Sequence, residues 1–258
     1  MRIDRNRVRN VFKNYTDLYD ATDEKIKLKI DHTYRVAELC ERIAASFGMS
    51  QVDKDLAWLL GMLHDIGRFE QLRNYGTFND AESVDHAALG ADLLFADGAM
   101  KKIRDYLEDT SEDVLIERAV RVHSAYRLPE NMEERTKRFS EILRDADKVD
   151  ILRVNVEIPL EEIYNVTSEE LRHAEVTDAV LESFFEHHAV LKSLKRTAVD
   201  HIVGHCSLVF ELVSKESLRI VKEQGYLWRM MKFDTKNPKT AEQFAIMREE
   251  MERYLAAI

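Results

Sequence analysis

Apolar residues recur at helical spacing from one end of the chain to the other, and this periodicity limits the possible folds more than any other feature. Turn-forming residues are scarce, because the 258 residues include only 8 Gly and 3 Pro. A sheet fold needs many turns, whereas a set of long helices needs few. The sequence therefore predicts an all-α fold, a helical bundle with additional C-terminal helices.

The periodic segments and the turn residues between them define the expected helices and domains. Clear breaks fall at residues 74–80, 128–131 and 158–159. We expect a first helical domain at residues 1–156, and a C-terminal helical lobe or cap packed on it at residues 157–258. Helices are expected at residues 3–18, 24–47, 52–73, 82–97, 99–109, 112–126, 134–156, 176–188, 195–214, 215–224 and 238–257.

Five of these helices each carry an ionisable residue where the pattern calls for an aliphatic one: His32, His64, His86, His123 and Asp147. Burying such a group without a partner costs about 2–7 kcal/mol, and more for a charge. A divalent cation would resolve this cost, because imidazoles and carboxylates are its ligands. A single histidine in such a position is more often a hydrogen-bonded core residue than a ligand, but five inward-pointing groups together favour a metal site.

The adjacent pair His64 and Asp65 is informative for a geometric reason. Neighbours on a helix point about 100° apart, so one metal can bind both only where the helix ends or turns tightly. Gly67 follows within two residues and would permit such an end.

Three segments in this order form a known pattern: residues 32–37 (HTYRVA), 59–68 (LLGMLHDIGR) and 145–150 (DADKVD). This pattern closely resembles the HD-domain superfamily of metal-dependent phosphohydrolases, whose signature is a His, a His-Asp pair and a distal Asp. The resemblance covers about residues 30–155. It implies an all-helical, HD-domain-like bundle in residues 1–156 with a metal at this tetrad.

The resemblance assigns His32, His64, Asp65 and Asp147 as metal ligands, with Asp145 as the alternative to Asp147. Some branches of the family bind a second metal through two further histidines, and residues 85–91 (DHAALGA) and 121–124 (RVHS) are similar to those positions. In that interpretation Asp65 bridges two ions, and His86 and His123 bind the second. In the alternative, a single metal is bound, and these two histidines face the phosphate or are structural.

One departure separates this chain from the branch that degrades cyclic dinucleotides. That branch carries a Gly-Tyr-Pro element and a doubled His near the fourth helix. Residues 124–129 read SAYRLP here, without a second His. Membership of that branch is therefore not predicted.

The implied reaction is hydrolysis of a phosphate ester or anhydride, in a nucleotide or related small molecule, by metal-activated water. The expected catalytic residues are Asp65, which would orient the nucleophile, Arg68 and Lys148. Arg68 could bind phosphate through its planar fork, or lie on the surface. Tyr75, Tyr126 and Arg127 are further candidates for binding substrate. One or two ions of Mn, Fe, Co, Ni or Zn suit these ligands better than Mg.

Charge and composition limit the partners. A net charge of −10 argues against binding a nucleic-acid polymer, which calls for a basic patch. No signal peptide or membrane span is evident, and the two cysteines read as free thiols, so we expect a cytoplasmic protein that does not bind membranes. The apolar stripe formed by Phe244, Met247, Met251, Tyr254 and Leu255 is expected in the core or in a homodimer contact.

Two other functions fit the same residues. The chain could be a non-catalytic, metal-containing HD module that senses a ligand or partner. It could also be a di-iron oxygenase, because some proteins with this fold resemble that class and six His and Asp ligands suit it.

Overall fold

A computed structural model describes residues 2–96, 102–160, 163 and 166–257. All regular structure in these ranges is helical, as predicted, and they contain no strand. None of the helices in them is apolar enough over a sufficient length to cross a membrane. The chain divides into two compact units, Met1–Asp147 and Lys148–Ile258. The expected domains, residues 1–156 and 157–258, remain a prediction.

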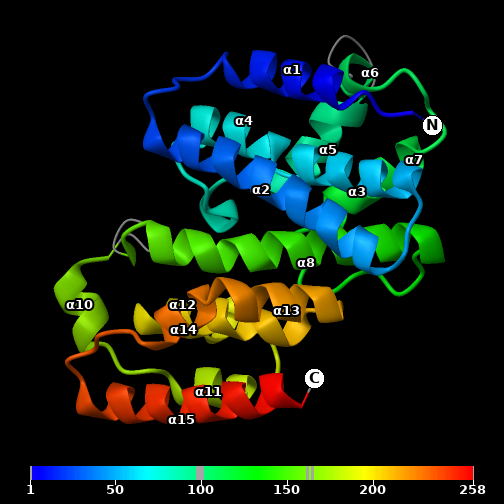
Figure 1. Ribbon diagram of the computed structural model, residues 1–258. Helices are drawn as coiled ribbons and strands as arrows, with labels where there is room; N and C mark the ends of the chain where they lie inside the picture. Colours follow the sequence, from blue (N-terminus) through cyan, green and yellow to red (C-terminus); the bar gives the residue numbers. More distant parts are fainter. Residues whose placement is uncertain (1, 97–101, 161–162, 164–165, 258) are drawn as a thin grey trace. The chain divides into compact units, whose positions relative to one another are not determined.

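Four α-helices of the first unit begin where a short polar side chain caps them. Asp4, Asp23, Ser50 and Asp85 each accept hydrogen bonds from backbone N–H groups in the first turn of the following helix. The helices (Figure 1) are α1 (Arg5–Thr16), α2 (Glu24–Ser46), α3 (Gln51–Leu63), α4 (Ile66–Tyr75), the short 3-10 helix η1 (Asp80–Glu82), α5 (His86–Phe95), α6 (Ile103–Tyr106), α7 (Asp113–Val122) and α8 (Glu134–Glu157), which continues into the second unit.

The core of the first unit depends on two close helix contacts, each made possible by a glycine. A Cβ on Gly61 of α3 would lie 2.4 Å from Cα of Ala37 on α2. A Cβ on Gly67 of α4 would lie 2.3 Å from the carbonyl oxygen of His86 and 2.7 Å from the backbone nitrogen of Gly90, both on α5. Glycine therefore lets the backbones of these helix pairs approach more closely than any other residue would.

The second unit contains α10 (Ser168–His173), α11 (Asp178–Phe185), η2 (Lys192–Leu194), α12 (Val199–Cys206), η3 (Ser207–Glu211), α13 (Lys215–Gln224), α14 (Tyr226–Met231) and α15 (Pro238–Ala256). The stripe of Phe244, Met247, Met251 and Leu255 on α15 is buried in its core. A homodimer remains a prediction. Cys40 in the first unit and Cys206 in the second are buried free thiols.

Several expected helices differ from those observed. The helix expected at 52–73 is two helices, α3 and α4, and the one expected at 195–214 is shorter and ends in the 3-10 helix η3. Residues 97–101 lie outside the described residues. The expected end of the helix at 82–97 and the expected beginning of the helix at 99–109 therefore lie outside them too. The helix that follows them is only Ile103–Tyr106. Two six-residue helices, α10 and α14, were not expected, because so short a segment shows almost no periodicity.

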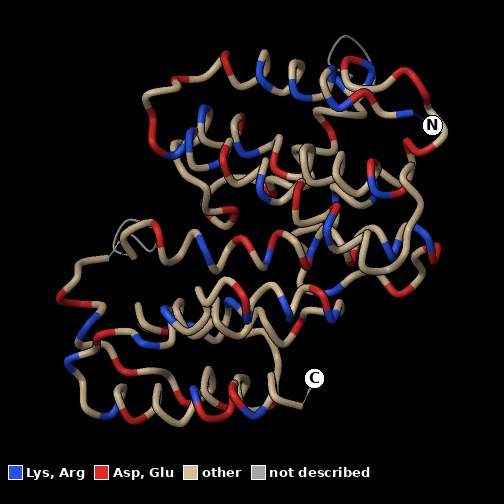
Figure 2. Tube along the Cα trace, viewed as in Figure 1, with Lys and Arg blue, Asp and Glu red and all other residues tan. Residues whose placement is uncertain are grey.

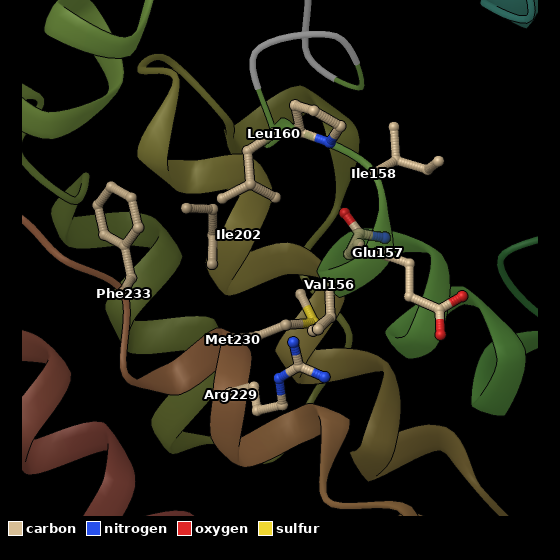
Figure 3. Close-up of a pocket in the computed structure, with 10 residues that line it drawn as sticks. Val156, Glu157, Ile158, Leu160, Ile202, Arg229, Met230 and Phe233 are labelled. Carbon is tan, nitrogen blue, oxygen red and sulfur yellow. The ribbon is translucent and has the colours of Figure 1, made fainter. Parts of the chain in front are cut away.

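Charges and pockets outside the metal-ligand candidates add little to a functional assignment. Acidic and basic residues are interspersed along the helices of each unit (Figure 2). A pocket of about 430 Å³ in the second unit is lined by the end of α8 and by residues such as Ile202, Met230 and Phe233 (Figure 3). None of its lining residues is among the predicted site residues.

Candidate metal centre

The six residues predicted as metal ligands come from six segments of the first unit. His32 lies in the middle of α2, and Asp147 lies on α8. His64 follows the last residue of α3, and Asp65 precedes the first residue of α4. The other two ligands lie at helix ends: His86 is the first residue of α5, and His123 follows the last residue of α7.

The chain changes direction at His64 and Asp65, and this break lets both side chains face the same point. Asp65 has φ −99° and ψ 14°, outside the helical range, and α4 begins at the next residue. From the sequence, a single helix was expected at residues 52–73, with Gly67 as the residue that would permit an end or a tight turn. Gly67 is inside α4, and its function is the close contact with α5 described above.

Four side chains form the first half of the cluster, which we call site A: His32, His64, Asp147 and the Oδ2 atom of Asp65. Nε2 of His32 lies 3.1 Å from Oδ1 of Asp147 and 3.3 Å from Nε2 of His64. Oδ2 of Asp65 lies 3.7 Å from Nε2 of His32 and 3.6 Å from Nε2 of His64. Nitrogen and oxygen atoms from three separate parts of the chain thus converge on one point.

The second half, site B, is formed by His86, His123 and the other oxygen of Asp65. Nε2 of His86 lies 3.2 Å from Nε2 of His123. Oδ1 of Asp65 lies 3.4 Å from Nε2 of His86 and 3.7 Å from Nε2 of His123. Each carboxylate oxygen of Asp65 therefore faces a different half of the cluster, which is the arrangement of a bridging ligand.

Hydrogen bonds on the far side of three imidazoles determine where their protons are. Nδ1 of His64 lies 2.7 Å from the carbonyl oxygen of Gly61, and Nδ1 of His123 lies 2.7 Å from that of Val120. A carbonyl oxygen only accepts, so each Nδ1 carries the proton. Nδ1 of His86 donates in the same way to the carboxylate of Asp80 at 2.7 Å. In the neutral rings of His64 and His86 the Nε2 lone pair is consequently directed into the cluster.

The environment keeps these groups in the protonation states that a metal requires. Burial lowers the pKa of His64 to about 4 and that of His86 to about 4, so both rings are neutral at pH 7. Burial disfavours the charged form of Asp65, but the Lys29 ammonium outweighs it and holds the pKa of this carboxyl well below its ordinary value. His64 and His86 are thus neutral, and Asp65 is ionised, at neutral pH.

These residues fit a divalent transition metal in both donor type and spacing. Two ligands bonded to one ion at about 2.0–2.2 Å lie roughly 3–3.5 Å apart for ordinary bond angles. The separations in sites A and B are close to this range, and the ligand atoms of His32, His64 and Asp147 lie within 4.8 Å of one another, as do those of His64, Asp65 and His123. Without a cation, the converging lone pairs and carboxylates would repel one another.

Two cations lie beside the bridging carboxylate. Nζ of Lys29, on α2 one turn before His32, lies 2.7 Å from Oδ2 of Asp65. Nε of Arg68 lies 3.7 Å from the other oxygen, Oδ1. The ring of Phe78 lies within 5.4 Å of the Lys29 ammonium and 5.8 Å of the Arg68 guanidinium. The loop after α4 therefore reaches the cluster.

Sequence reasoning missed Lys29, Asp80 and Arg144. Arg144 on α8 is 7% exposed and donates hydrogen bonds to the carbonyl oxygens of His123, Ala125 and Tyr126, among others, and so holds the chain just after α7. The spacing of Lys29, three residues before His32 on one helix face, was a usable signal. Asp80 and Arg144 act through contacts that no local pattern encodes.

The remaining candidates lie in different environments. Asp145 is buried on α8, but it is Asp147 that lies among the histidines. Tyr75, at the end of α4, is 51% exposed, and about 15 Å of helix separates it from Asp65. Tyr126 is 41% exposed, with the Arg127 guanidinium over its ring.

Lys148 follows Asp147 on α8 and is half-buried. The predicted roles of Lys148, Tyr75, Tyr126 and Arg127 remain predictions.

Comparison with known proteins identifies the region that carries this cluster. Residues 30–152 match the family model described as HD domain. This range includes all six candidate ligands. No curated protein and no solved structure matches the chain significantly. Residues 30–152 are therefore similar to the HD domain, the family that the sequence motifs resemble.

Proposed function

We propose that this protein is a phosphohydrolase that uses two divalent transition-metal ions, one in site A and one in site B. Its substrate in this proposal is a phosphate ester or anhydride of a nucleotide or a related small molecule. The observation that carries the proposal is the convergence of acceptors around Asp65: the Nε2 atoms of His86 and His123 lie 3.2 Å apart, while their Nδ1 protons point away from the cluster.

The proposed chemistry divides between the ions and the surrounding side chains. Bound divalent ions would make hydroxide available at neutral pH and neutralise charge on the phosphoryl oxygens. Asp65 accepts a hydrogen bond from the attacking water and so orients it. Lys29 and Arg68, on either side of Asp65, hold the phosphoryl oxygens and stabilise their charge in the transition state.

The hydrogen bonds of Arg68 support its role in binding phosphate. Its Nη1 donates to Asp80, Gln71 and the carbonyl oxygen of Phe78, and these bonds fix the guanidinium in place. Its Nε is buried and has no hydrogen-bond acceptor among the described residues. A buried donor without an acceptor is costly, and an oxygen of a bound phosphate or water would satisfy it.

The exposure of the ligands indicates where a substrate enters. The side chains of His32, His64 and Asp65 are at most 3% exposed, whereas that of Asp147 is 16% exposed. Site A is therefore accessible from the side of Asp147. A phosphate that approaches from there meets the metals first.

The test combines metal analysis with a substrate panel. Protein purified without added metal is analysed by mass spectrometry and then assayed with Mn, Co, Ni and Mg on nucleotides and aryl phosphates. We expect about two transition-metal ions per chain and metal-dependent release of phosphate or nucleotide. Asp65→Asn should lose at least one ion and most of the hydrolysis. Asp31→Asn, a matched change at an exposed carboxylate next to His32, should behave as wild type.

The outcomes separate the proposal from the other functions considered. If Asp65→Asn retains both the metal content and the activity, the proposal is wrong. Two bound metals with no hydrolysis of any compound in the panel would favour a sensor module. Iron alone, with substrate-dependent oxygen consumption, would favour a di-iron oxygenase, whose carboxylate-bridged, histidine-rich ligand set this cluster resembles.

A further inference from the structure

One carboxylate outside the ligand set contacts both a candidate ligand and the candidate phosphate-binding residue. Oδ2 of Asp80 accepts a hydrogen bond from Nδ1 of His86 at 2.7 Å. Oδ1 of the same residue accepts from Nη1 of Arg68 at 2.8 Å and from Nε2 of Gln71 at 2.8 Å. Asp80 lies on η1, in the loop between α4 and α5, and its side chain is 22% exposed.

We propose that Asp80 is a positioning residue. It fixes His86 of the second metal site and the substrate-binding Arg68 in position relative to each other. This inference rests on the proposed function, because it assumes a metal in site B and phosphate at Arg68. It assigns a function to a residue that neither binds the metal nor touches the reacting atoms.

Site B depends on the side chain of Asp80 for the orientation of one of its two histidines. The rings of His64 and His123 are oriented by the backbone carbonyls of Gly61 and Val120, which no substitution removes. The orientation of His86 depends instead on a side chain. Site B also has three candidate ligands, compared with four in site A. Loss of the His86 orientation would therefore leave only two well-placed ligands there.

The hydrogen bonds around Asp80 require a carboxylate at this position. Both of its oxygens face N–H donors: the imidazole on one side, and Arg68 and Gln71 on the other. An asparagine has one acceptor and one donor, so in either orientation its NH₂ group would face another donor. Asp80→Asn therefore keeps the size of the side chain but cannot keep both contacts.

Asp80 is itself held in place, which a positioning residue requires. Gln71, which is fully buried, donates to Asp80 and also to the hydroxyl of Ser83 and the carbonyl oxygen of Val84. The hydroxyl of Ser83 donates in turn to the carbonyl oxygen of Asn79. These bonds fix η1 against α4.

Metal stoichiometry tests the inference directly. Metal-free wild type and variants are titrated with Mn²⁺ in a calorimeter, and the number of bound ions is checked by mass spectrometry. Wild type should bind two ions. Asp80→Asn should bind the first with wild-type affinity and the second about 10- to 100-fold more weakly, the usual cost of losing a side chain that orients a ligand. His86→Ala should lose the second ion in the same way.

Glu82→Gln is the matched control. Glu82 is exposed and lies on the same short helix, η1, as Asp80. This variant should bind two ions as wild type does.

The Arg68 contact has its own measurement. At saturating Mn²⁺, inorganic phosphate should inhibit hydrolysis by the Asp80→Asn variant less strongly than hydrolysis by wild type. Wild-type affinity for both ions in Asp80→Asn would overturn the inference while leaving the proposed function intact. The inference would also be overturned if Asp80→Asn bound both ions more weakly to the same degree, or if phosphate inhibited it as strongly as wild type. A wild-type protein that binds no metal would instead show that the proposed function itself is wrong.

Discussion

The Nε2 atoms of His32 and His64 lie 3.3 Å apart, although the two residues belong to different helices. The Nδ1 proton of His64 is bound by the Gly61 carbonyl, so its Nε2 presents a lone pair to the other ring. Burial keeps His64 neutral at pH 7 by lowering its pKa to about 4, so this lone pair is available to bind a metal cation.

Lys29 tests whether the cations beside Asp65 act on the substrate. Lys29→Met removes the ammonium 2.7 Å from Asp65 but leaves every candidate ligand in place. We expect metal content near that of wild type and a kcat/KM for hydrolysis about 10- to 100-fold lower. This decrease corresponds to the loss of one charge-assisted hydrogen bond to the transition state. Lys27→Met, an exposed position on the same helix, is the control. Equal activity in the two variants would exclude Lys29 from the site.

Gly61 tests the packing that brings α2 and α3 together. Helix propensity alone favours alanine over glycine by up to about 1 kcal/mol. A Cβ on Gly61 would, however, lie 2.4 Å from Cα of Ala37, so Gly61→Ala must separate the helices. We expect a loss of about 1–3 kcal/mol in the free energy of unfolding, measured by denaturant titration, together with weaker binding in site A.

Gly204→Ala is the matched control for that substitution. A Cβ there would meet only the flexible end of the Lys195 side chain, which can move. This variant should be neutral or slightly stabilising and should retain both metals. A Gly61→Ala variant that is as stable as Gly204→Ala would contradict the close-packing explanation.

The stability of the metal-free protein should depend on pH through its buried histidines. The pKa of His86 falls from 6.5 to about 4 on folding, as does that of His64, so the unfolded chain binds more protons between these values. Their contribution to stability is complete above about pH 6.5 and is lost as the pH falls toward 4. Each residue changes the free energy of unfolding by up to about 1.4 kcal/mol per pH unit in this window.

Denaturant titrations of wild type and His86→Gln between pH 4.5 and 7 measure this effect. The variant lacks one of the titrating groups, so its stability should vary less steeply with pH. Parallel curves for the two proteins would show that His86 is not buried in its neutral form.

Arg144→Lys tests the support behind site B. Lysine has three N–H donors and cannot replace all the bonds of Arg144 to the carbonyl oxygens of Val122, His123, Ala125 and Tyr126, and leaving a buried acceptor unsatisfied costs about 1–3 kcal/mol. We expect lower stability and weaker binding of the second ion, with the first ion retained. Thermal unfolding and the Mn²⁺ titration measure these effects. A stable variant with two tightly bound ions would contradict this role.

Much of the fold and the ligand set follows from local pattern. Helical periodicity identified the long helices, and the histidines that interrupt apolar faces are the same ones that converge in the structure. The break at His64 and Asp65 was not located, because apolar residues continue on both sides of it and the turn depends on how α4 packs against α5.

The residues that support the ligands are harder to infer from sequence. Asp80 lies in an irregular loop, and its importance arises from bonds to His86, six residues away, and to Arg68, twelve residues away. Arg144 precedes Asp147 on an ordinary helix, but its partners lie about 20 positions earlier in the chain. Both functions depend on tertiary contacts that periodicity does not reveal.

Anomalous diffraction from crystals grown with Mn²⁺ tests the central claim most directly. The account predicts two anomalous peaks about 3.5–4 Å apart, one bonded to Nε2 of His32 and His64, the other to Nε2 of His86 and His123. One carboxylate oxygen of Asp65 should lie within bonding distance of each peak. A map with no peak within bonding distance of these nitrogens, at Mn²⁺ concentrations that support hydrolysis, would contradict the account.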